Sequence, residues 1–256
     1  MIELLPSREV ILSIFGFSVH WYGIMYLTAF LFVYWSLKKL QRFRSLTLSD
    51  DDRSAVLTWA VVGVIIGGRL GYVLFYGPTY FVSHPLEVFA VWQGGMSSHG
   101  GFIGVALALW YVLKKRRINP LAFLDVIAAP VAVGLAFGRL GNFINLELYG
   151  TVTDVSWAIA IPGVEGLRHP TQLYAIAKDL FIAAVCFWHL RFIAKHGSTI
   201  AVFLIFYGVL RFVVEYYRDQ PYGFIDIGIA ELSRGQLLTI PVVILGLLLL
   251  WKTQRS

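Results

Sequence analysis

The chain has 256 residues, of which 58% are apolar, 16% aromatic and only 14% charged, and its mean hydropathy is +0.71. A soluble domain is about 45–50% apolar and about 25% charged, so the composition excludes a water-soluble globule, a disordered chain and a collagen-like repeat. The single cysteine, Cys186, cannot form an internal disulfide, which excludes a disulfide-stabilised scaffold. The composition predicts a polytopic membrane protein.

Apolar stretches of membrane-crossing length recur along the chain. A bilayer core about 30 Å thick needs about 20 residues of helix, and helices pair every backbone group that lies in lipid. We predict about seven transmembrane helices, at His20–Leu37, Ala55–Phe75, Ser98–Leu113, Leu121–Leu140, Gln172–Ile193, Thr199–Tyr217 and Arg234–Trp251. The expected fold class is an all-α polytopic membrane protein, with residues 1–256 forming a single integral membrane domain.

The cations are distributed unevenly along the chain. Thirteen of the 21 Lys and Arg residues lie on one side of the predicted spans. They are Lys38, Lys39, Arg42, Arg44, Arg53, Lys114, Lys115, Arg116, Arg117, Arg191, Lys195, Lys252 and Arg255. The positive-inside rule makes this side cytoplasmic, which places the N-terminus outside and the C-terminus inside. The net charge of +6 therefore indicates membrane topology rather than a nucleic-acid partner.

Residues 141–171 form the longest predicted outer segment, rich in Gly, Pro and turn residues. The segment is too long for a simple hairpin loop. We predict that it folds as a small outer-face cap between the fourth and fifth spans.

Arg69, Arg139 and Arg211 lie within or at the outer ends of predicted spans. An arginine at membrane depth costs several kcal/mol unless it is paired or hydrated, so each is a functional candidate. Singly, each could also snorkel to the interface or form a structural ion pair. Arg211, Glu215 and Arg218 follow helical spacing and share a face. Glu215 therefore either forms a buried structural pair or aims the Arg211 guanidinium at a phosphate.

A dense polar segment follows Arg139. It contains Asn142, Asn145 and Glu147 between closely spaced glycines. Glycines permit a close backbone approach, and asparagines both donate and accept hydrogen bonds. Beside an arginine at membrane depth, this segment predicts the wall of a polar pocket.

A second polar segment predicts a glycine turn, a serine cap and a helix whose first turn is His99-Gly100-Gly101. The exposed N–H groups of such a turn bind anions. Gly100 and Gly104, like Gly63, Gly67 and Gly71, also have the four-residue spacing of small residues that pack membrane helices together. His99 is a candidate general base because an unperturbed imidazole titrates near neutral pH. A lone interfacial histidine is, however, more often structural.

Taken together, these segments resemble the bacterial prolipoprotein diacylglyceryl transferase family. The family's signature, Gly-Arg-x-Gly-Asn-Phe-x-Asn-x-Glu-x-x-Gly, is similar to the run from Gly138 to Gly150, where every fixed position is present. Further similar blocks follow in the family's order, at His20–Gly23, Gly67–Tyr72, Gly94–Gly101, His169–Tyr174, Arg211–Glu215 and Gly235–Gln236.

The resemblance implies transfer of the diacylglyceryl group of phosphatidylglycerol to the lipobox cysteine thiol of preprolipoproteins. The products are a thioether and glycerol phosphate, and the implied location is the bacterial cytoplasmic (inner) membrane, with the active site towards the outer leaflet. His99, Arg139 and Arg211 are implied as catalytic residues, with no metal or other cofactor and no nucleic-acid partner. The implied partners are phosphatidylglycerol, preprolipoprotein signal peptides and membrane lipids. The substrate-binding residues expected are Tyr22, Arg69, Gly100, Gly101, Asn142, Asn145, Glu147, Gly150, Glu215 and Arg218.

Two other classes of function are weighed against the transferase. An anion or lipid transporter using buried arginines would favour inverted repeats near the bilayer midplane. Here the polar motifs cluster near the outer leaflet. The one apparent sequence repeat is Gly-Arg-Leu-Gly, at Gly68–Gly71 and Gly138–Gly141, and both copies lie on predicted helices that run in the same direction. A noncatalytic lipid-binding scaffold would tolerate loss of His99 more readily than loss of the arginines.

Overall fold

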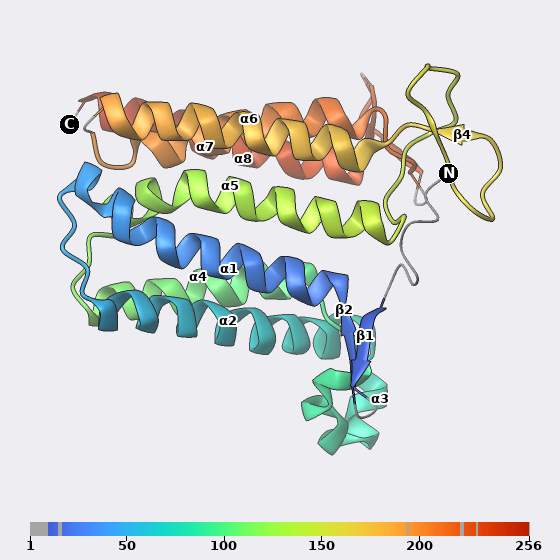
Figure 1. Cartoon of the computed structure of the whole chain (residues 1–256), viewed down its shortest axis with the longest axis horizontal. Helices are drawn as coiled ribbons and strands as arrows, with labels where there is room; N and C mark the ends of the chain where they lie inside the picture. Colours follow the sequence, from blue (N-terminus) through green and yellow to red (C-terminus); the bar gives the residue numbers. More distant parts are fainter. Residues whose placement is uncertain (1–9, 15–16, 194, 221–222, 229, 256) are drawn as a thin grey trace. The chain divides into compact units, whose positions relative to one another are not determined.

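The computed structural model describes residues 10–14, 17–193, 195–220, 223–228 and 230–255 (Figure 1). Within these residues, seven helices have 18 residues or more, and each overlaps one predicted span. They are α1 (Trp21–Leu40), α2 (Asp50–Tyr76), α4 (Ser98–Lys115), α5 (Pro120–Ile144), α6 (Thr171–Phe192), α7 (Ser198–Glu215) and α8 (Arg234–Arg255). Five of them, α2, α5, α6, α7 and α8, are long and apolar enough to cross a membrane. The chain is therefore a helical, multi-pass membrane protein.

Short elements connect the long helices. Three antiparallel two-stranded hairpins pair β1 (Val10–Ile14) with β2 (Phe17–His20), β3 (Ile159–Ala160) with β4 (Leu167–Arg168), and β5 (Phe224–Asp226) with β6 (Glu231–Ser233). The remaining elements are η1 (Gln41–Arg44), α3 (Pro78–Ser83), η2 (Pro85–Phe89) and η3 (Val91–Gln93).

Most helix ends differ from the predicted spans by a few residues, and three of these differences bear on the predicted cap, site or capping. Helix α2 begins early, at Asp50, because Ser49 and Asp52 form a capping box. Helix α5 continues past Leu140 to Ile144, so the first residues of the predicted cap are helical. Helix α7 ends at Glu215 instead of Tyr217, so Arg218 lies beyond the helix, although its guanidinium faces Glu215 as the spacing predicts.

The chain divides into two compact units. Unit 1 contains the described residues up to Arg44 and from Leu124 onwards, and unit 2 is Ser45–Phe123. Each unit is described by itself below.

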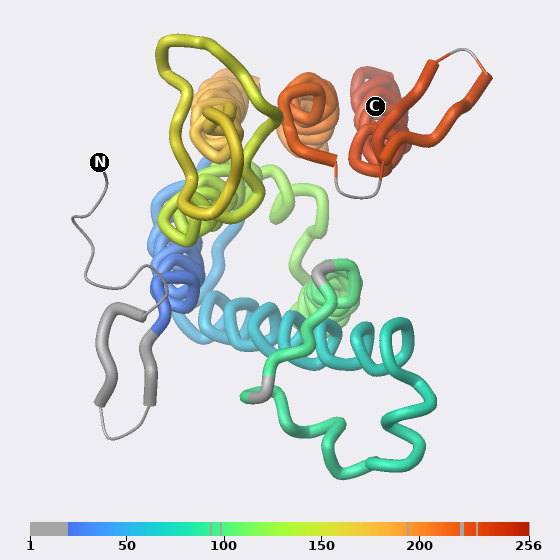
Figure 2. The backbone as a smooth tube through the Cα atoms, turned by 90° about the vertical axis from the view of Figure 1, so that its right-hand side faces the viewer, coloured from blue at the N-terminus to red at the C-terminus, as the bar shows by residue number. Residues whose placement is uncertain are grey.

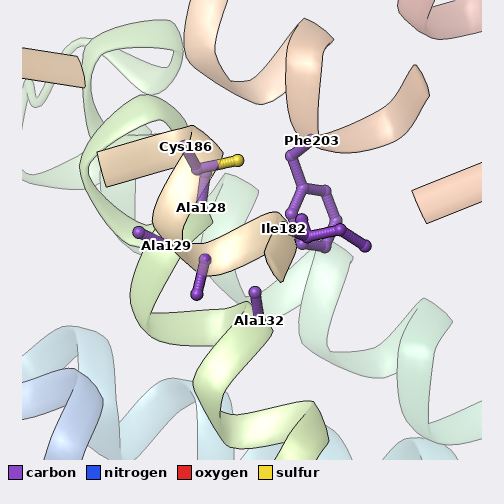
Figure 3. Packing of buried hydrophobic residues seen from close by; sticks show 7 residues of the cluster. Ala128, Ala129, Ala132, Ile182, Cys186 and Phe203 are labelled. Atoms are coloured by element: carbon purple, nitrogen blue, oxygen red, sulfur yellow. The ribbon is translucent and has the colours of Figure 1, made fainter. Parts of the chain in front are cut away.

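Small residues allow the helices of unit 1 to pack closely. Helix α5 presents Ala128, Ala129 and Ala132 to Ile182 and Cys186 of α6, with Phe203 of α7 completing the cluster (Figure 3). Alanines at these positions let the helix backbones approach, as is usual between membrane helices. Helices α6, α7 and α8 lie side by side (Figure 2).

Buried charges fix one end of unit 1, here called the Arg44 end. Arg44 Nε lies 2.6 Å from Asp125 Oδ2, and Arg44 Nη2 donates to Thr199 Oγ1 at 2.7 Å. Asp125 also accepts hydrogen bonds from the backbone N–H groups of Gly197 and Ile200, both at 2.8 Å. These bonds join η1, α5 and the start of α7.

Glycines hold the two long helices of unit 2 together. Gly63, Gly67 and Gly71 of α2 face Gly100 and Gly104 of α4, and a Cβ on any of the five would come within 3.0 Å of the facing backbone. Helix packing, one of the two roles predicted for these small residues, is therefore confirmed.

Candidate active site

Five helix ends of unit 1 meet in one place, here called the polar end. Helices α1, α6 and α8 begin there, and α5 and α7 end there. The contacts that join them run from Gly141 to the Tyr22 ring, from Gln172 Nε2 to Glu147 O at 2.6 Å, and from Gly235 to the Glu215 carboxylate. The polar residues predicted on separate spans are thus brought to the same end of the unit.

Arg139 lies in the last two turns of α5 and begins a chain of side-chain hydrogen bonds. Its Nη1 donates to Asn142 Oδ1 at 3.3 Å. The Asn142 amide donates in turn to Tyr22 Oη at 3.4 Å and to Glu147 Oε2 at 3.1 Å. Asn145 Nδ2 reaches the other Glu147 oxygen at 3.4 Å. The dense segment predicted to line a pocket is therefore one connected polar network.

Arg211 and Arg218 share a single carboxylate. Glu215 Oε2 lies 3.1 Å from Arg211 Nη2 and 3.7 Å from Arg218 Nη1, and Glu215 is 4% exposed. Arg218 follows one further turn, its N–H donating to Glu215 O at 3.2 Å, and its backbone also forms a β-bridge with Gly150. One buried carboxylate thus compensates only part of two guanidinium charges.

The arginines of the polar end act on one another electrostatically. Burial lowers the pKa of Arg218 below its usual value; Glu215 opposes this shift, and the positive charges of Arg211 and Arg139 add to it. Lys178 and Asp179 of α6 form a separate buried ion pair. Among the described residues, no carboxylate lies within 4.0 Å of Arg139. The polar end therefore carries uncompensated positive charge, which suits an anionic ligand.

Backbone contacts tie the segment after α5 to the segment after α7. The Gly150 N–H donates to His169 O at 2.9 Å, and the Thr151 N–H donates to Tyr217 O at 2.9 Å. A Cβ on Gly150 would overlap Tyr217 O and approach His169 Cβ to 2.6 Å. Gly150 is therefore required by close packing of three chain segments, and its predicted contact with substrate stays a prediction.

His99 belongs to unit 2, in the first turn of α4. Ser97 caps this turn, since its Oγ accepts from the Gly100 N–H at 3.3 Å, as the sequence predicts. The His99 side chain is exposed and has no hydrogen-bond partner among the described residues. Gly100 packs against Gly67, whereas Gly101 leaves space for a methyl group, its nearest neighbour being Val64 O at 3.8 Å.

Arg69 holds the loop that leads to His99. Its guanidinium donates to the carbonyls of Glu87, Val88, Gly94 and Gly95 at 2.5–3.2 Å, and Arg69 is 6% exposed. Every guanidinium nitrogen is used by backbone carbonyls. This geometry favours a loop-holding role over the substrate contact predicted for Arg69. The two copies of the Gly-Arg-Leu-Gly repeat therefore differ in structure, because Arg69 contacts backbone carbonyls and Arg139 contacts a side-chain amide.

Sequence reasoning missed two sets of polar residues. Arg44 is assigned to topology by its loop position, yet it is buried against Asp125. The signal was present, because an aspartate inside an apolar span needs a partner. Gln172 and Gln236 are each 1% exposed and carry unpaired amide atoms at the polar end. Both residues lie within the blocks that resemble the family, but the sequence alone assigns them no role.

The described residues contain no group of three or more His, Cys, Asp or Glu side chains placed to hold a metal ion. What they do contain is a cluster of guanidinium groups beside a chain of amides and one tyrosine hydroxyl. This donor set can bind a phosphate and stabilise negative charge that develops on a leaving phosphate.

The sequence is similar to one family of proteins over nearly its whole length. A family described as prolipoprotein diacylglyceryl transferase matches residues 9–252. A phosphatidylglycerol–prolipoprotein diacylglyceryl transferase of Geobacter sulfurreducens is 44% identical over 232 residues, covering 89% of this chain and 88% of the relative. Relatives of the same name from Bordetella parapertussis (42% identity, 96% and 95% covered) and Nitrosomonas europaea (41% identity, 96% and 90% covered) are similar over comparable lengths.

Proposed function

Because the chain belongs to the prolipoprotein diacylglyceryl transferase family, we propose that it transfers the diacylglyceryl group of phosphatidylglycerol to a prolipoprotein. The acceptor is the lipobox cysteine thiol of a preprolipoprotein signal peptide, and the step is the first in lipoprotein maturation. The relatives carry the name of a transferase, and nothing in the comparisons supports the transporter alternative.

One observation supports this chemistry above the others. At the polar end of unit 1, Arg139 begins the hydrogen-bonded chain through Asn142 to Tyr22, and Arg211 and Arg218 share the single carboxylate of Glu215. Phosphatidylglycerol carries one negative phosphodiester, and transfer requires that phosphate to leave from a glycerol carbon. Guanidinium groups placed together stabilise the departing charge without moving during the reaction.

The proposed reaction is a displacement at carbon. The cysteine sulfur attacks the carbon of the diacylglycerol moiety that bears the phosphate. A C–S bond forms at this carbon, and the bond between the same carbon and the phosphate oxygen breaks. The electron pair of the broken bond leaves on glycerol phosphate, where Arg139 and Arg211 stabilise it. The thiol proton goes to His99, because a free thiol with a pKa of about 8.5 is mostly protonated near neutral pH.

The remaining predicted residues take supporting roles in this proposal. Glu215 orients Arg211 and Arg218 through its ion pairs. Asn142, Asn145 and Glu147 position substrate through the network that connects Arg139 with Tyr22. Gly101 permits close approach of a ligand, and Gly100, Gly150 and Arg69 shape the backbone around the site.

We also propose the membrane arrangement. All seven long helices cross the bacterial inner membrane, with the N-terminus outside and the C-terminus in the cytoplasm, and the two units form one membrane domain. The segment between α5 and α6 forms the outer-face cap, and the polar end faces the outer leaflet. The support is the charge distribution, since the predicted cytoplasmic side carries thirteen of the 21 cations.

A reconstituted assay tests the proposed function. The purified chain is placed in vesicles containing phosphatidylglycerol and mixed with a lipobox peptide. We expect a diacylglyceryl mass increase on the peptide, which a peptide with serine in place of the cysteine does not acquire. Arg139→Ala and Arg211→Ala should fold normally and lose about 100-fold or more in kcat. Absence of any transfer by the wild-type chain, or wild-type turnover in both variants, would overturn the proposal.

A further inference from the structure

Unpaired polar atoms gather at the polar end of unit 1. Six buried side-chain N or O atoms of the described residues have no hydrogen-bond partner, and five of them belong to this end. They are Trp21 Nε1, Asn145 Oδ1, Gln172 Oε1, Gln236 Nε2 and Glu215 Oε2, and of these only Glu215 Oε2 has ion-pair partners, Arg211 and Arg218. Buried polar atoms are normally paired, because an unmade bond costs free energy. A cluster with both donors and acceptors indicates a ligand that completes these bonds.

Gln236 is the clearest donor in this set, because its carboxamide can take only one orientation. Its Oε1 accepts from the Ser233 N–H at 2.9 Å. Exchanging O and N would set the NH₂ group against that N–H, so Nε2 must be the unpaired atom. The side chain is 1% exposed, and its backbone N–H is held by Ser233 Oγ at 3.1 Å. The donor is therefore fixed before any ligand arrives.

The first turn of α8 places Gln236 beside the arginine cluster. The preceding residue, Gly235, lies so close to Glu215 that a Cβ there would overlap the carboxylate. That carboxylate pairs with Arg211 and Arg218. The Gln236 donor thus stands in the helical turn that packs directly on the residue orienting the two guanidinium groups.

We propose that Gln236 reads the headgroup of the lipid substrate, its Nε2 donating a hydrogen bond to a hydroxyl of the phosphatidylglycerol headgroup. The inference rests on the proposed function and names a specificity residue for it. Guanidinium groups recognise the phosphate that all phospholipids share, so they cannot select among headgroups. A fixed neutral donor can select among headgroups, because a lipid without a matching hydroxyl leaves the buried donor unpaired and therefore binds more weakly.

The test compares two lipids that differ only in headgroup hydroxyls. One is phosphatidylglycerol, and the other carries a propanol headgroup on the same phosphodiester. The variant Gln236→Met keeps the side-chain length and removes the donor. Ser233→Ala is the matched control, because it removes the hydroxyl that holds the Gln236 backbone and leaves the carboxamide in place. The readouts are kcat and KM for transfer to a lipobox peptide, with thermal unfolding in detergent.

We expect the wild-type chain to favour phosphatidylglycerol over the propanol lipid in kcat/KM. In Gln236→Met, kcat/KM for phosphatidylglycerol should fall about tenfold, mainly through KM, and that for the propanol lipid should stay unchanged. Ser233→Ala should keep the wild-type preference even if its unfolding temperature falls.

Two results would overturn the inference. One is an equal loss on both lipids in Gln236→Met, which would assign the donor to the phosphate or to packing. The other is an unchanged preference in a folded Gln236→Met. If Gln236→Met does not fold, Gln236→Leu replaces it, because leucine has neither donor nor acceptor, and it must lose the preference for the hydroxylated headgroup. Failure of the proposed function is distinct, because the wild-type chain would then transfer nothing from either lipid.

Discussion

Arg211 Nη2 and Glu215 Oε2 lie 3.1 Å apart at the end of α7, and the same oxygen is 3.7 Å from Arg218 Nη1. A lone buried ion pair would satisfy Glu215 and leave Arg211 as a structural residue. Here one carboxylate serves two guanidinium groups, and Arg139 adds a third positive charge that no described carboxylate neutralises within 4.0 Å. Of the two roles considered for Glu215, this arrangement favours the functional one, in which Glu215 orients the arginine side chains.

Glu215→Gln should therefore lower turnover more than it weakens lipid binding. The amide keeps the shape of the side chain but loses both ion pairs, so the guanidinium groups are held less firmly. A misplacement of about 1 Å can cost about 100-fold in rate, and we expect a fall in kcat of that order with a smaller change in KM for phosphatidylglycerol. The control is Glu165→Gln, which neutralises an exposed carboxylate in the segment between α5 and α6. Full turnover by Glu215→Gln would contradict the orienting role.

Arg69 gives a second prediction, in which two roles lead to different outcomes. Arg69→Lys keeps the charge but cannot reach the carbonyls of Glu87, Val88, Gly94 and Gly95 together. We expect faster amide hydrogen exchange in residues 87–97 and a lower kcat. The measurement is hydrogen exchange by mass spectrometry beside steady-state kinetics. Unchanged exchange together with a raised KM for phosphatidylglycerol would instead assign Arg69 to substrate, as the sequence predicts.

The long helices were predictable because their signal is local. Apolar stretches of about 20 residues mark membrane helices wherever they pack, and all seven predicted spans overlap long helices. Helix ends were less predictable, since they depend on capping and on later segments. Helix α5 extends to Ile144, and Arg218 leaves the α7 helix to bridge with Gly150, a residue far away in the sequence.

Partnerships between distant residues explain most of what the sequence did not predict. Arg44 has the charge and position of a topological signal, and only folding reveals that it pairs with Asp125, 81 residues later. Arg69 and Arg139 stand in the same four-residue motif, yet backbone carbonyls surround one and an amide contacts the other. The same motif therefore supplies an arginine at both positions, but the role of each arginine depends on the residues that fold against it.

The Arg44–Asp125 pair leads to a third prediction, about stability. Asp125→Asn removes the charge that compensates buried Arg44 and weakens the acceptor of two backbone N–H groups. Breaking a buried pair in this way costs about 3–5 kcal/mol, so we expect a clearly lower unfolding temperature in detergent. The double variant Arg44→Met with Asp125→Leu should recover part of the loss. Turnover per folded molecule should stay near wild type, because the pair lies at the opposite end of α5 from Arg139. A single variant as stable as wild type would contradict the structural role.

The fourth prediction separates two neighbouring glycines in the first turn of α4. A Cβ on Gly100 would overlap Gly67 O in α2, whereas a Cβ on Gly101 would meet only Val64 O, at 3.8 Å. Gly100→Ala should therefore push the helices apart and destabilise the chain by about 1–3 kcal/mol, with loss of activity as a consequence. Gly101→Ala should keep the wild-type unfolding temperature.

Activity of Gly101→Ala then reports directly on the site beside His99. If a substrate approaches the backbone there, as proposed, the added methyl group should raise KM for lipid or peptide while the fold is intact. The matched measurement is steady-state kinetics on both variants, each normalised to its folded fraction. Wild-type kinetics in Gly101→Ala would remove Gly101 from the substrate-binding set. Equal unfolding temperatures for the two variants would contradict the close packing of Gly100 against α2.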